Sequence, residues 1–225
     1  MELVLIRHGQ PAWDNDGRSV DDPGLTDLGH RQAAAVAARL AGTRVDRLLV
    51  SPLVRARQTA APIAEAVGLD PEVQPWMAEI GNPTWEGTPT EEVERIFRDN
   101  RGRSIEEQWE GLPGGESFRA FHDRVTSGLR SFLDDAGAVQ ITDDPPQWRL
   151  VEPDRRFVLV AHAGTNAAAL GHLLGVHPVP WEWERFVSFH ASVTVLTPLE
   201  IAGGWAFSLL RFSDTAHLEP SDQSR

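Results

Sequence analysis

The chain of 225 residues contains no cysteine. This absence excludes disulfide bonds, thiolate nucleophiles, and zinc or iron–sulfur sites built on cysteine. It fits a reducing compartment, and we take the cytoplasm as the expected location.

Long apolar runs and an excess of positive charge are also missing. The only apolar run at the N-terminus, Leu3 to Ile6, is too short for a signal-peptide core or a membrane span. The formal net charge of −12 disfavours nucleic acid and membrane surfaces as partners, because both would repel the protein. A small anion can still bind where arginines gather, so the expected partners are small molecules, with a homodimer left open.

The composition that remains is that of an ordinary globular protein, with 41% hydrophobic and 24% charged residues. We therefore expect a single domain over residues 1–225. Strand and helix signals alternate along the chain. This alternation predicts an α/β fold, a three-layer αβα sandwich whose mostly parallel central sheet is covered by helices on both faces.

Apolar segments bounded by turn residues predict the strands of this sheet, over residues 2–6, 46–50, 156–161, 192–197 and 205–212. Amphipathic or alanine-rich segments predict the helices, over residues 26–40, 51–67, 90–99, 117–135 and 165–174. Thr26 and Ser51 are expected to cap the first two helices through their hydroxyl groups. Pro52 then suits the first helical position.

Three segments do not follow the alternating pattern. Residues 76–115 are rich in tryptophan, proline and glycine, and predict an insertion that caps the carboxyl edge of the sheet. Residues 136–154 are turn-rich and predict a surface excursion. Residues 213–225 predict a polar, frayed tail. None of the three predicts a second globular domain.

Basic and imidazole side chains follow three of the predicted strands. Arg7-His8-Gly9 follows the first, Ser51 to Arg55 the second, and His162-Ala163-Gly164 the strand over 156–161. Ligands of open parallel sheets bind outside the carboxyl ends of the strands. The three segments are therefore expected to meet at one edge of the sheet.

These segments also carry a family resemblance. Residues 5–13, which read Leu-Ile-Arg-His-Gly-Gln-Pro-Ala-Trp, resemble the opening RHG motif of the histidine phosphatase (phosphoglycerate mutase-like) superfamily. Further matches follow in the family's order, at residues 25–33, 51–60, 79–80, 85–87, 114–117 and 160–164. A lone Arg-His-Gly is a weak signal, but the ordered series over residues 3–175 is a specific one.

The resemblance implies a metal-independent phosphomonoesterase, a histidine acid phosphatase-like hydrolase that uses no cofactor. It would act on a small phosphorylated metabolite and release inorganic phosphate. His8 would be the nucleophile that forms a phosphohistidine, with its second ring nitrogen held by a backbone carbonyl. Glu79 would protonate the leaving alcohol and later activate water. Arg7, Arg55 and His162 would bind the phosphoryl group and stabilise its charge in the transition state, His162 as a catalytic electrophile.

Each of these residues also has an ordinary structural interpretation. A histidine beside an arginine often faces solvent, and His162 alone could be a core residue at a strand end. Glu79 has acidic neighbours over residues 86–94, one of which an insertion could bring into its place. Arg31 and Arg57 are expected on exposed helix faces. The remaining histidines lack the spacing of metal ligands, so no metal site is predicted.

The substrate side separates a phosphatase from a mutase. Mutases of the family typically carry Phe-Thr-Gly-Trp soon after the first motif, whereas residues 16–24 read Asp-Gly-Arg-Ser-Val-Asp-Asp-Pro-Gly. This favours the phosphatase branch. A cofactor-dependent phosphoglycerate mutase stays as the alternative, and a non-catalytic phosphate-binding module as a third. Two interpretations are open for the arginines of the cap region: they contact a second anionic group of the substrate, or they form a solvated helix face. These residues are Arg95, Arg98, Arg101 and Arg103.

Two positions depart from the family pattern. Asp14 follows Trp13 where many relatives carry asparagine, which puts one polar contact to the phosphoryl group in question. Ala163 follows His162 where glycine is common. Its methyl group is expected to restrict how closely the backbone approaches phosphate.

Overall fold

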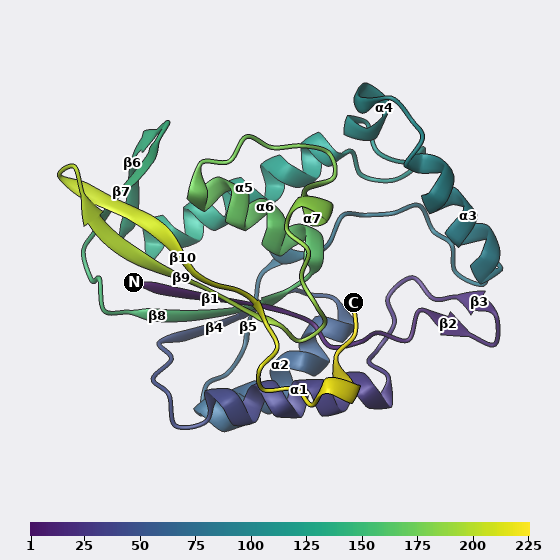
Figure 1. Ribbon diagram of the computed structural model, residues 1–225, viewed down its shortest axis with the longest axis horizontal. Helices are drawn as coiled ribbons and strands as arrows, with labels where there is room; N and C mark the ends of the chain where they lie inside the picture. Colours follow the sequence, from purple (N-terminus) through teal and green to yellow (C-terminus); the bar gives the residue numbers. More distant parts are fainter.

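The computed structural model describes residues 1–225, and its centre is an eight-stranded sheet with the order β5-β4-β8-β1-β9-β10-β7-β6 (Figure 1). The strands of this sheet are β1 (Glu2–Arg7), β4 (Arg47–Val50), β5 (Glu72–Val73), β6 (Ala138–Asp143), β7 (Pro146–Leu150), β8 (Arg156–Ala161), β9 (Val193–Ile201) and β10 (Gly204–Asp214). A separate hairpin pairs β2 (Asp14–Asn15) with β3 (Arg18–Ser19).

Strands β5, β4, β8 and β1 run parallel and form the middle of the fold. β1 and β8 are almost continuous buried apolar runs, which strands covered on both faces require. Beyond β1 the sheet continues through antiparallel pairings with β9, β10, β7 and β6. The predicted α/β fold is confirmed, and its parallel strands direct their carboxyl ends to one end of the molecule (Figure 1).

Helices cover both faces of the sheet. Because side chains of a strand alternate between its two faces, alternate residues of β1 pack into two separate cores. Val4 and Ile6 pack with α1 (Asp27–Leu40) and α2 (Val54–Val67). Leu3 and Leu5 pack with α5 (Phe118–Asp135) and α6 (Ala163–Leu174). The shorter elements are α3 (Thr90–Asn100), α4 (Ile105–Trp109), α7 (Glu182–Arg185), and the 3-10 turns η1 (Pro75–Met77) and η2 (Pro220–Asp222). None of the helices has the length and apolar character that crossing a membrane requires.

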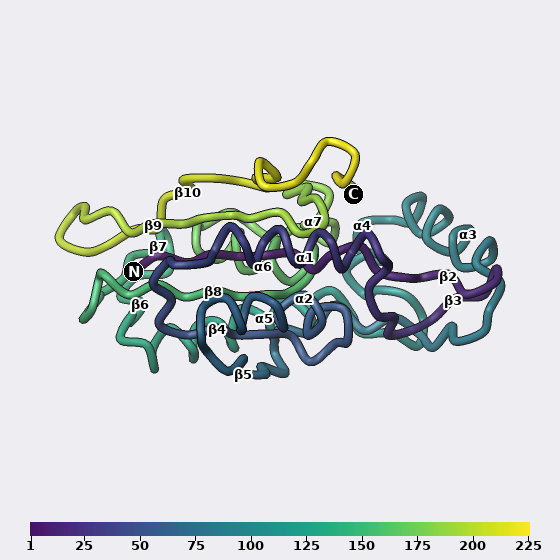
Figure 2. The backbone as a smooth tube through the Cα atoms, turned by 90° about the horizontal axis from the view of Figure 1, so that it is seen from below, coloured from purple at the N-terminus to yellow at the C-terminus, as the bar shows by residue number.

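Residues 76–115, here called the cap segment, leave the sheet on the side of the carboxyl ends of β1, β4 and β8. Both views place α3 and α4 at one end of the molecule, together with the β2–β3 hairpin (Figures 1 and 2). Backbone hydrogen bonds join the two parts: Ser19 N–H donates to the Thr88 carbonyl at 2.8 Å, and Gly87 N–H donates to the Ser19 carbonyl at 2.9 Å. The hairpin and the cap segment are therefore one connected unit.

Residues 136–154 differ from the predicted surface excursion. They form the β6–β7 hairpin, which adds two strands to the edge of the sheet. Asp144 and Pro145 supply the turn, whereas Ala138 and Trp148 on the strands are fully buried in the core. Burial of these two side chains outweighs the turn signals that dominate the sequence.

The tail after Ser213 also differs from the prediction, because it is held and not frayed. Leu218 is buried, and Arg39 of α1 pairs with Asp214 at 2.6 Å. Gln32 Nε2 donates to the Asp222 carbonyl at 2.7 Å. These contacts lay the segment along α1 and bring Ser224 beside His190.

Of the two hydroxyl caps predicted from the sequence, that of Thr26 is confirmed and that of Ser51 is wrong. Thr26 is the N-cap of α1, and its side chain accepts from Gly29 N–H at 3.0 Å. Ser51 is not a cap. Leu53 holds an extended conformation before α2, so the helix begins at Val54 and the Ser51 hydroxyl is free to bind elsewhere.

Candidate active site

Four of the predicted site residues meet at the carboxyl ends of the parallel strands. Arg7 ends β1 and His8 follows it, Arg55 lies in the first turn of α2, and His162 lies between β8 and α6. The His8 and His162 ring centroids are 5.0 Å apart. Arg55 Nε lies 3.3 Å from His8 Nε2. The sequence predicted this meeting, because each segment follows the carboxyl end of a strand in a parallel sheet.

His8 is buried, and its tautomer follows from its neighbours. Nδ1 lies 2.7 Å from the Gly9 carbonyl oxygen, which can only accept, so Nδ1 carries the hydrogen. Nε2 then keeps its lone pair, toward which Arg55 donates. Burial lowers the pKa of His8 well below 6.5, and the charges of Arg55 and Arg7 together with His162 lower it further. The ring is therefore neutral at neutral pH, and its Nε2 carries a lone pair.

His162 is fully buried, and its ring contacts Ser51, which the sequence predicted to be a helix cap. Its Nε2 lies 2.7 Å from Ser51 Oγ, which also accepts from Leu53 N–H. No other acceptor contacts this hydroxyl, so it donates its hydrogen to Nε2, and Nδ1 carries the imidazole proton. Nδ1 is buried without a protein partner. Burial, reinforced by Arg55 and Arg7, lowers the pKa of His162, so the ring offers a neutral Nδ1–H donor.

The two arginines place fixed positive charge beside His8. Arg7 donates from Nη1 to the Ser188 carbonyl at 2.5 Å, and its Nη2 lies 3.0 Å from His190 Nε2. Arg55 lies 4.7 Å from the centroid of the Trp13 ring. Burial lowers the pKa of Arg7 to about 10, which still leaves it charged at neutral pH. Nowhere in the structure do three or more His, Asp or Glu side chains gather in a way that could hold a metal ion.

Glu79 lies against the start of α6, next to His162. Its carboxylate accepts from Gly164 N–H at 2.9 Å and from Ile80 N–H at 3.1 Å. A Cβ atom on Gly164 would lie 2.5 Å from Glu79 Oε1, so glycine at this position leaves room for the carboxylate. Of its acidic neighbours, Glu86 accepts from Asp21 N–H on the β2–β3 side and does not line the site.

Arg124 of α5 is a supporting residue that sequence reasoning missed. It donates to the carbonyls of Trp76 at 3.0 Å and Ala78 at 3.1 Å, directly before Glu79. Its charge is paired with Glu116 at 2.7 Å. Glu116 belongs to the motif at residues 114–117 that resembles the family. Its pairing with Arg124 could not be predicted, because it depends on how α5 packs against residues 76–79. Arg124 thus fixes the loop that presents Glu79.

A cleft of about 1050 Å³ opens from Arg7, Glu79 and Gly164 and runs between the cap segment and α7. Its lining mixes polar and charged residues with aromatic and apolar ones, the latter including Phe97, Leu112, Phe118, Trp181, Trp183 and Val187. Glu184 stands in it between two arginines, 3.5 Å from Arg101 and 3.1 Å from Arg225. The cleft is large enough to hold the part of a ligand that extends beyond a phosphoryl group.

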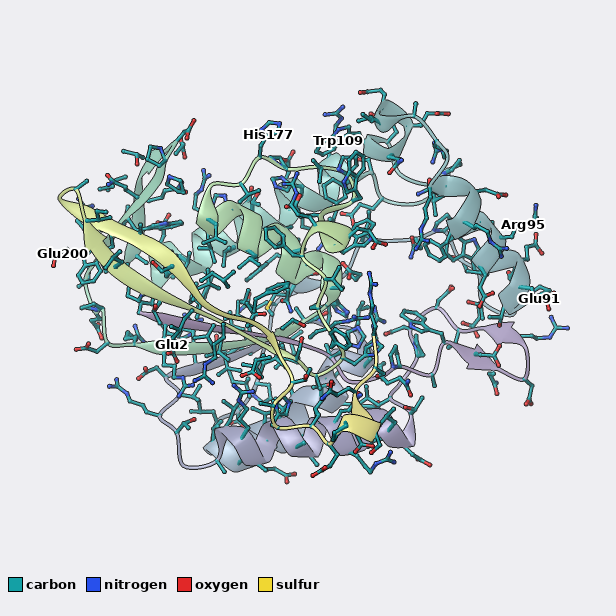
Figure 3. All side chains as sticks on the ribbon, in the orientation of Figure 1. Glu2, Glu91, Arg95, Trp109, His177 and Glu200 are labelled. Carbon is teal, nitrogen blue, oxygen red and sulfur yellow. The ribbon has the colours of Figure 1, made fainter.

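The four arginines of the cap segment have different surroundings. Arg101 lines the cleft. Arg103 donates to the Gly111 carbonyl at 2.8 Å and stabilises the segment itself. Arg98 is exposed, and Arg95 faces Glu92 across an exposed 3.8 Å pair. Figure 3 shows Arg95 on the outer side of α3, at the end of the molecule opposite Glu200.

Asp14 turns away from the site. Its carboxylate accepts from Gly17 N–H at 3.0 Å and from the Thr90 hydroxyl at 2.5 Å, so it ties the hairpin to α3. Ala163, the other departure from the family pattern, lines the cleft as the first residue of α6.

Gly9, the glycine of the RHG motif, packs against the start of α1. A Cβ atom at this position would lie 2.5 Å from the Gly29 carbonyl oxygen, so a larger residue would clash with the backbone.

Comparisons with known proteins agree with this geometry. The family model of the histidine phosphatase superfamily (branch 1) matches residues 3–212. Phosphoserine phosphatase 1 of Hydrogenobacter thermophilus is 33% identical over 202 residues, which cover 87% of this chain and 86% of that protein. A probable phosphoglycerate mutase of Yersinia enterocolitica is 29% identical over 224 residues, covering 97% and 95%.

Among solved structures, a mycobacterial glucosyl-3-phosphoglycerate phosphatase superposes with a TM-score of 0.72 at 25% identity, covering 95% of this chain and 99% of that one. The same enzyme has been solved with inorganic phosphate, at a TM-score of 0.70 and 27% identity, covering 97% and 99%. The residues matched by the family model include Arg7, His8, Arg55, Glu79 and His162. The chain belongs to the histidine phosphatase superfamily.

Proposed function

We propose that this protein is a metal-independent phosphomonoesterase that transfers the phosphoryl group of a small phosphorylated metabolite to His8 Nε2 and then to water. The observation that carries the proposal is the state of His8. It is buried and neutral, with Nδ1–H held by the Gly9 carbonyl and Nε2 facing the Arg55 guanidinium. An imidazole in this state is a nucleophile at neutral pH.

In the first half-reaction the phosphoryl group lies between Arg7, Arg55 and Nδ1–H of His162. These donors stabilise the charge on the equatorial oxygens without reorganisation, because the protein already holds them in place. His8 Nε2 forms the bond to phosphorus as the bond to the leaving oxygen breaks. Glu79, in its protonated form, gives its proton to that oxygen and becomes a carboxylate.

In the second half-reaction a water molecule attacks the phosphohistidine. Glu79 takes a proton from this water, and the phosphorus–nitrogen bond breaks as the new phosphorus–oxygen bond forms. His8 returns to its neutral form with the hydrogen on Nδ1, inorganic phosphate leaves, and Glu79 is protonated for the next cycle.

The alternative is a phosphoglycerate mutase, the activity in the name of the Yersinia relative. A mutase must keep water away from its phosphohistidine while the product turns around. The cleft beside Glu79 is wide and open, which gives water access to this position and favours hydrolysis. Phosphoserine and glucosyl-3-phosphoglycerate, named in two relatives, are the first substrates to test.

The experiment uses purified protein with an aryl phosphate, followed by phosphoserine, glucosyl-3-phosphoglycerate and 3-phosphoglycerate, the last with and without a bisphosphate primer. We expect release of inorganic phosphate and its loss in the His8→Ala variant. Quenching in alkaline detergent should retain a phosphoryl label on His8, and later treatment with acid should release it. A wild-type protein that hydrolyses none of these between acidic and neutral pH contradicts the proposal. Rapid, primer-dependent formation of 2-phosphoglycerate would instead support the mutase.

A further inference from the structure

A second buried histidine, His190, lies directly behind the phosphate-binding arginine. It is 5% exposed, and its ring centroid is 5.7 Å from that of His8. Its Nε2 lies 3.0 Å from Arg7 Nη2. Its Nδ1 lies 3.0 Å from Ser224 Oγ. The proposed reaction uses no atom of His190, so a buried imidazole in this place needs another explanation.

The neighbours of His190 determine which ring nitrogen carries the hydrogen. The guanidinium of Arg7 can only donate, so His190 Nε2 must be the acceptor. Nδ1 therefore carries the hydrogen and donates it to Ser224 Oγ. Burial, with the positive charge of Arg7, lowers the pKa of His190 to about 3, and the ring stays a neutral acceptor throughout the working range of pH.

Ser224 connects His190 to the far side of the segment that carries His8. Its hydroxyl also accepts from Gln32 Nε2 at 3.0 Å, and Gln32 is fully buried. The Oε1 atom of Gln32 accepts from Gln10 N–H at 2.8 Å. Arg7 and Gln10, which bracket His8 in the sequence, are thus joined through His190, Ser224 and Gln32. We call this set of hydrogen bonds the loop brace.

We propose that His190 is a positioning residue that orients the Arg7 guanidinium toward the phosphoryl group, and that the segment around Ser224 supports it through the loop brace. Arg7 has one further anchor, the Ser188 carbonyl at Nη1. One contact leaves the planar group free to rotate, whereas two contacts fix its plane. The inference rests on the proposed role of Arg7 in phosphate binding.

Two near-isosteric substitutions separate the two ends of the imidazole. In His190→Gln the side-chain oxygen reaches the position of Nε2, which keeps the acceptor for Arg7 and removes the donor to Ser224. In His190→Asn the amide nitrogen stands near Nδ1, which keeps the donor to Ser224 and removes the acceptor. His190→Ala removes both, and Ser224→Ala tests the brace beyond the ring.

The first measurement is binding of inorganic phosphate and of vanadate by calorimetry, which needs no turnover. We expect His190→Asn and His190→Ala to weaken binding by roughly tenfold to a hundredfold, the effect of losing a charge-assisted hydrogen bond. His190→Gln should recover most of this loss. In assays, KM should rise more than kcat falls, because ground-state binding of the phosphoryl group is affected.

A second readout is independent of any ligand. Long-range ¹H–¹⁵N correlation spectra of the wild type should show His190 with the hydrogen on Nδ1 at pH 7. Equal phosphate affinity in the wild type and folded His190→Ala overturns the proposal, and so does a His190→Gln variant that loses as much affinity as His190→Asn. If the wild type binds phosphate but hydrolyses nothing, the proposed function fails while the role of His190 is still tested.

Discussion

The phosphoryl pocket and the cleft beside it are built in opposite ways. In the pocket, Arg55 is 3% exposed, His8 4% and His162 0%. Arg55 and His8 each make two side-chain hydrogen bonds, and His162 Nε2 contacts Ser51. In the cleft, Phe97 is 44% exposed, and the side chains of Arg101 and Arg225 are exposed and share one glutamate. The pocket is buried and hydrogen-bonded, which suits the single phosphoryl group that we propose it binds. The cleft has room and side-chain freedom for different leaving groups.

This contrast explains how one superfamily includes proteins named for different substrates. The chemistry needs fixed dipoles and charges, and its residues come from strand ends that the core holds in place. In the proposed reaction, the remaining part of the substrate would contact the cap segment and α7, whose surface side chains can change without disturbing the sheet. Substitutions in the two regions should therefore differ in size and in kind.

The largest effect is expected for Glu79→Gln. The amide cannot supply a proton to the leaving oxygen or accept one from water, so kcat should fall about 10²- to 10⁴-fold. Glu86→Gln is the matched control, because Glu86 lies nearby in the sequence and binds Asp21 outside the pocket. Steady-state kinetics on an aryl phosphate and on an alkyl phosphate measure both. A kcat unchanged in Glu79→Gln with the alkyl substrate would remove Glu79 from the mechanism.

The pocket should also have a measurable effect on stability at low pH. Three of its histidines, His8, His162 and His190, have folded-state pKa values below the usual 6.5 because of burial. As the pH falls below 6.5, the unfolded chain takes up protons that the folded chain does not, so the free energy of unfolding decreases. The slope approaches about 1.4 kcal/mol per pH unit for each histidine.

Urea unfolding at several pH values between 7 and 5 measures this slope. The His190→Gln variant should show a shallower decrease than the wild type, because its unfolded state has one histidine fewer to protonate. Equal slopes in the two proteins would mean that His190 titrates normally in the folded state.

An intermediate effect is expected for Ser51→Ala. Without the hydroxyl, His162 Nε2 loses its donor and the imidazole proton is free to move away from Nδ1. We expect kcat to fall roughly tenfold, the effect of one buried hydrogen bond on an oriented electrophile. Ser131→Ala on the exposed side of α5 is the control. Nitrogen chemical shifts of His162 should report the change of tautomer, and a variant with the wild-type tautomer would contradict our assignment.

The smallest effect is expected in the cleft. Arg101→Ala removes an exposed charge, so KM for an extended anionic substrate should rise by only about two- to fivefold. Inhibition by vanadate should not change, because the pocket is untouched. Arg95→Ala, on the outer side of α3, should alter neither value. If Arg101→Ala weakens vanadate inhibition, the two regions are coupled and the contrast between them is too simple.

Much of this organisation could be predicted from the sequence. The apolar runs of β1 and β8, the hydroxyl cap of α1 and the basic residues after three strands were enough to predict the layers and the meeting of Arg7, His8, Arg55 and His162. Local patterns carry this information, because strand ends and helix starts are determined by neighbouring residues.

The contacts between distant segments could not be predicted in this way. The sequence favoured a capping role for Ser51 because a Ser-Pro pair usually begins a helix, whereas its hydroxyl contacts His162, 111 positions away. The β6–β7 hairpin looked like a loop because its turn residues are conspicuous and the burial of Trp148 depends on the core beneath it. Arg124 and His190 are ordinary helix and loop residues until Glu79 and Arg7 lie beside them.

The link between the hairpin and the cap segment affects how substrate preference could be transplanted between relatives. Asp21 accepts from Trp85 N–H of the cap segment at 2.9 Å, while the next residue, Asp22, pairs with Arg55 at 3.3 Å. A chimaera that exchanges only residues 76–115 would separate the new cap from its native hairpin and disturb Arg55 through Asp22. The natural unit of exchange is therefore discontinuous, and a working recombinant must inherit residues 14–22 from the same parent as its cap.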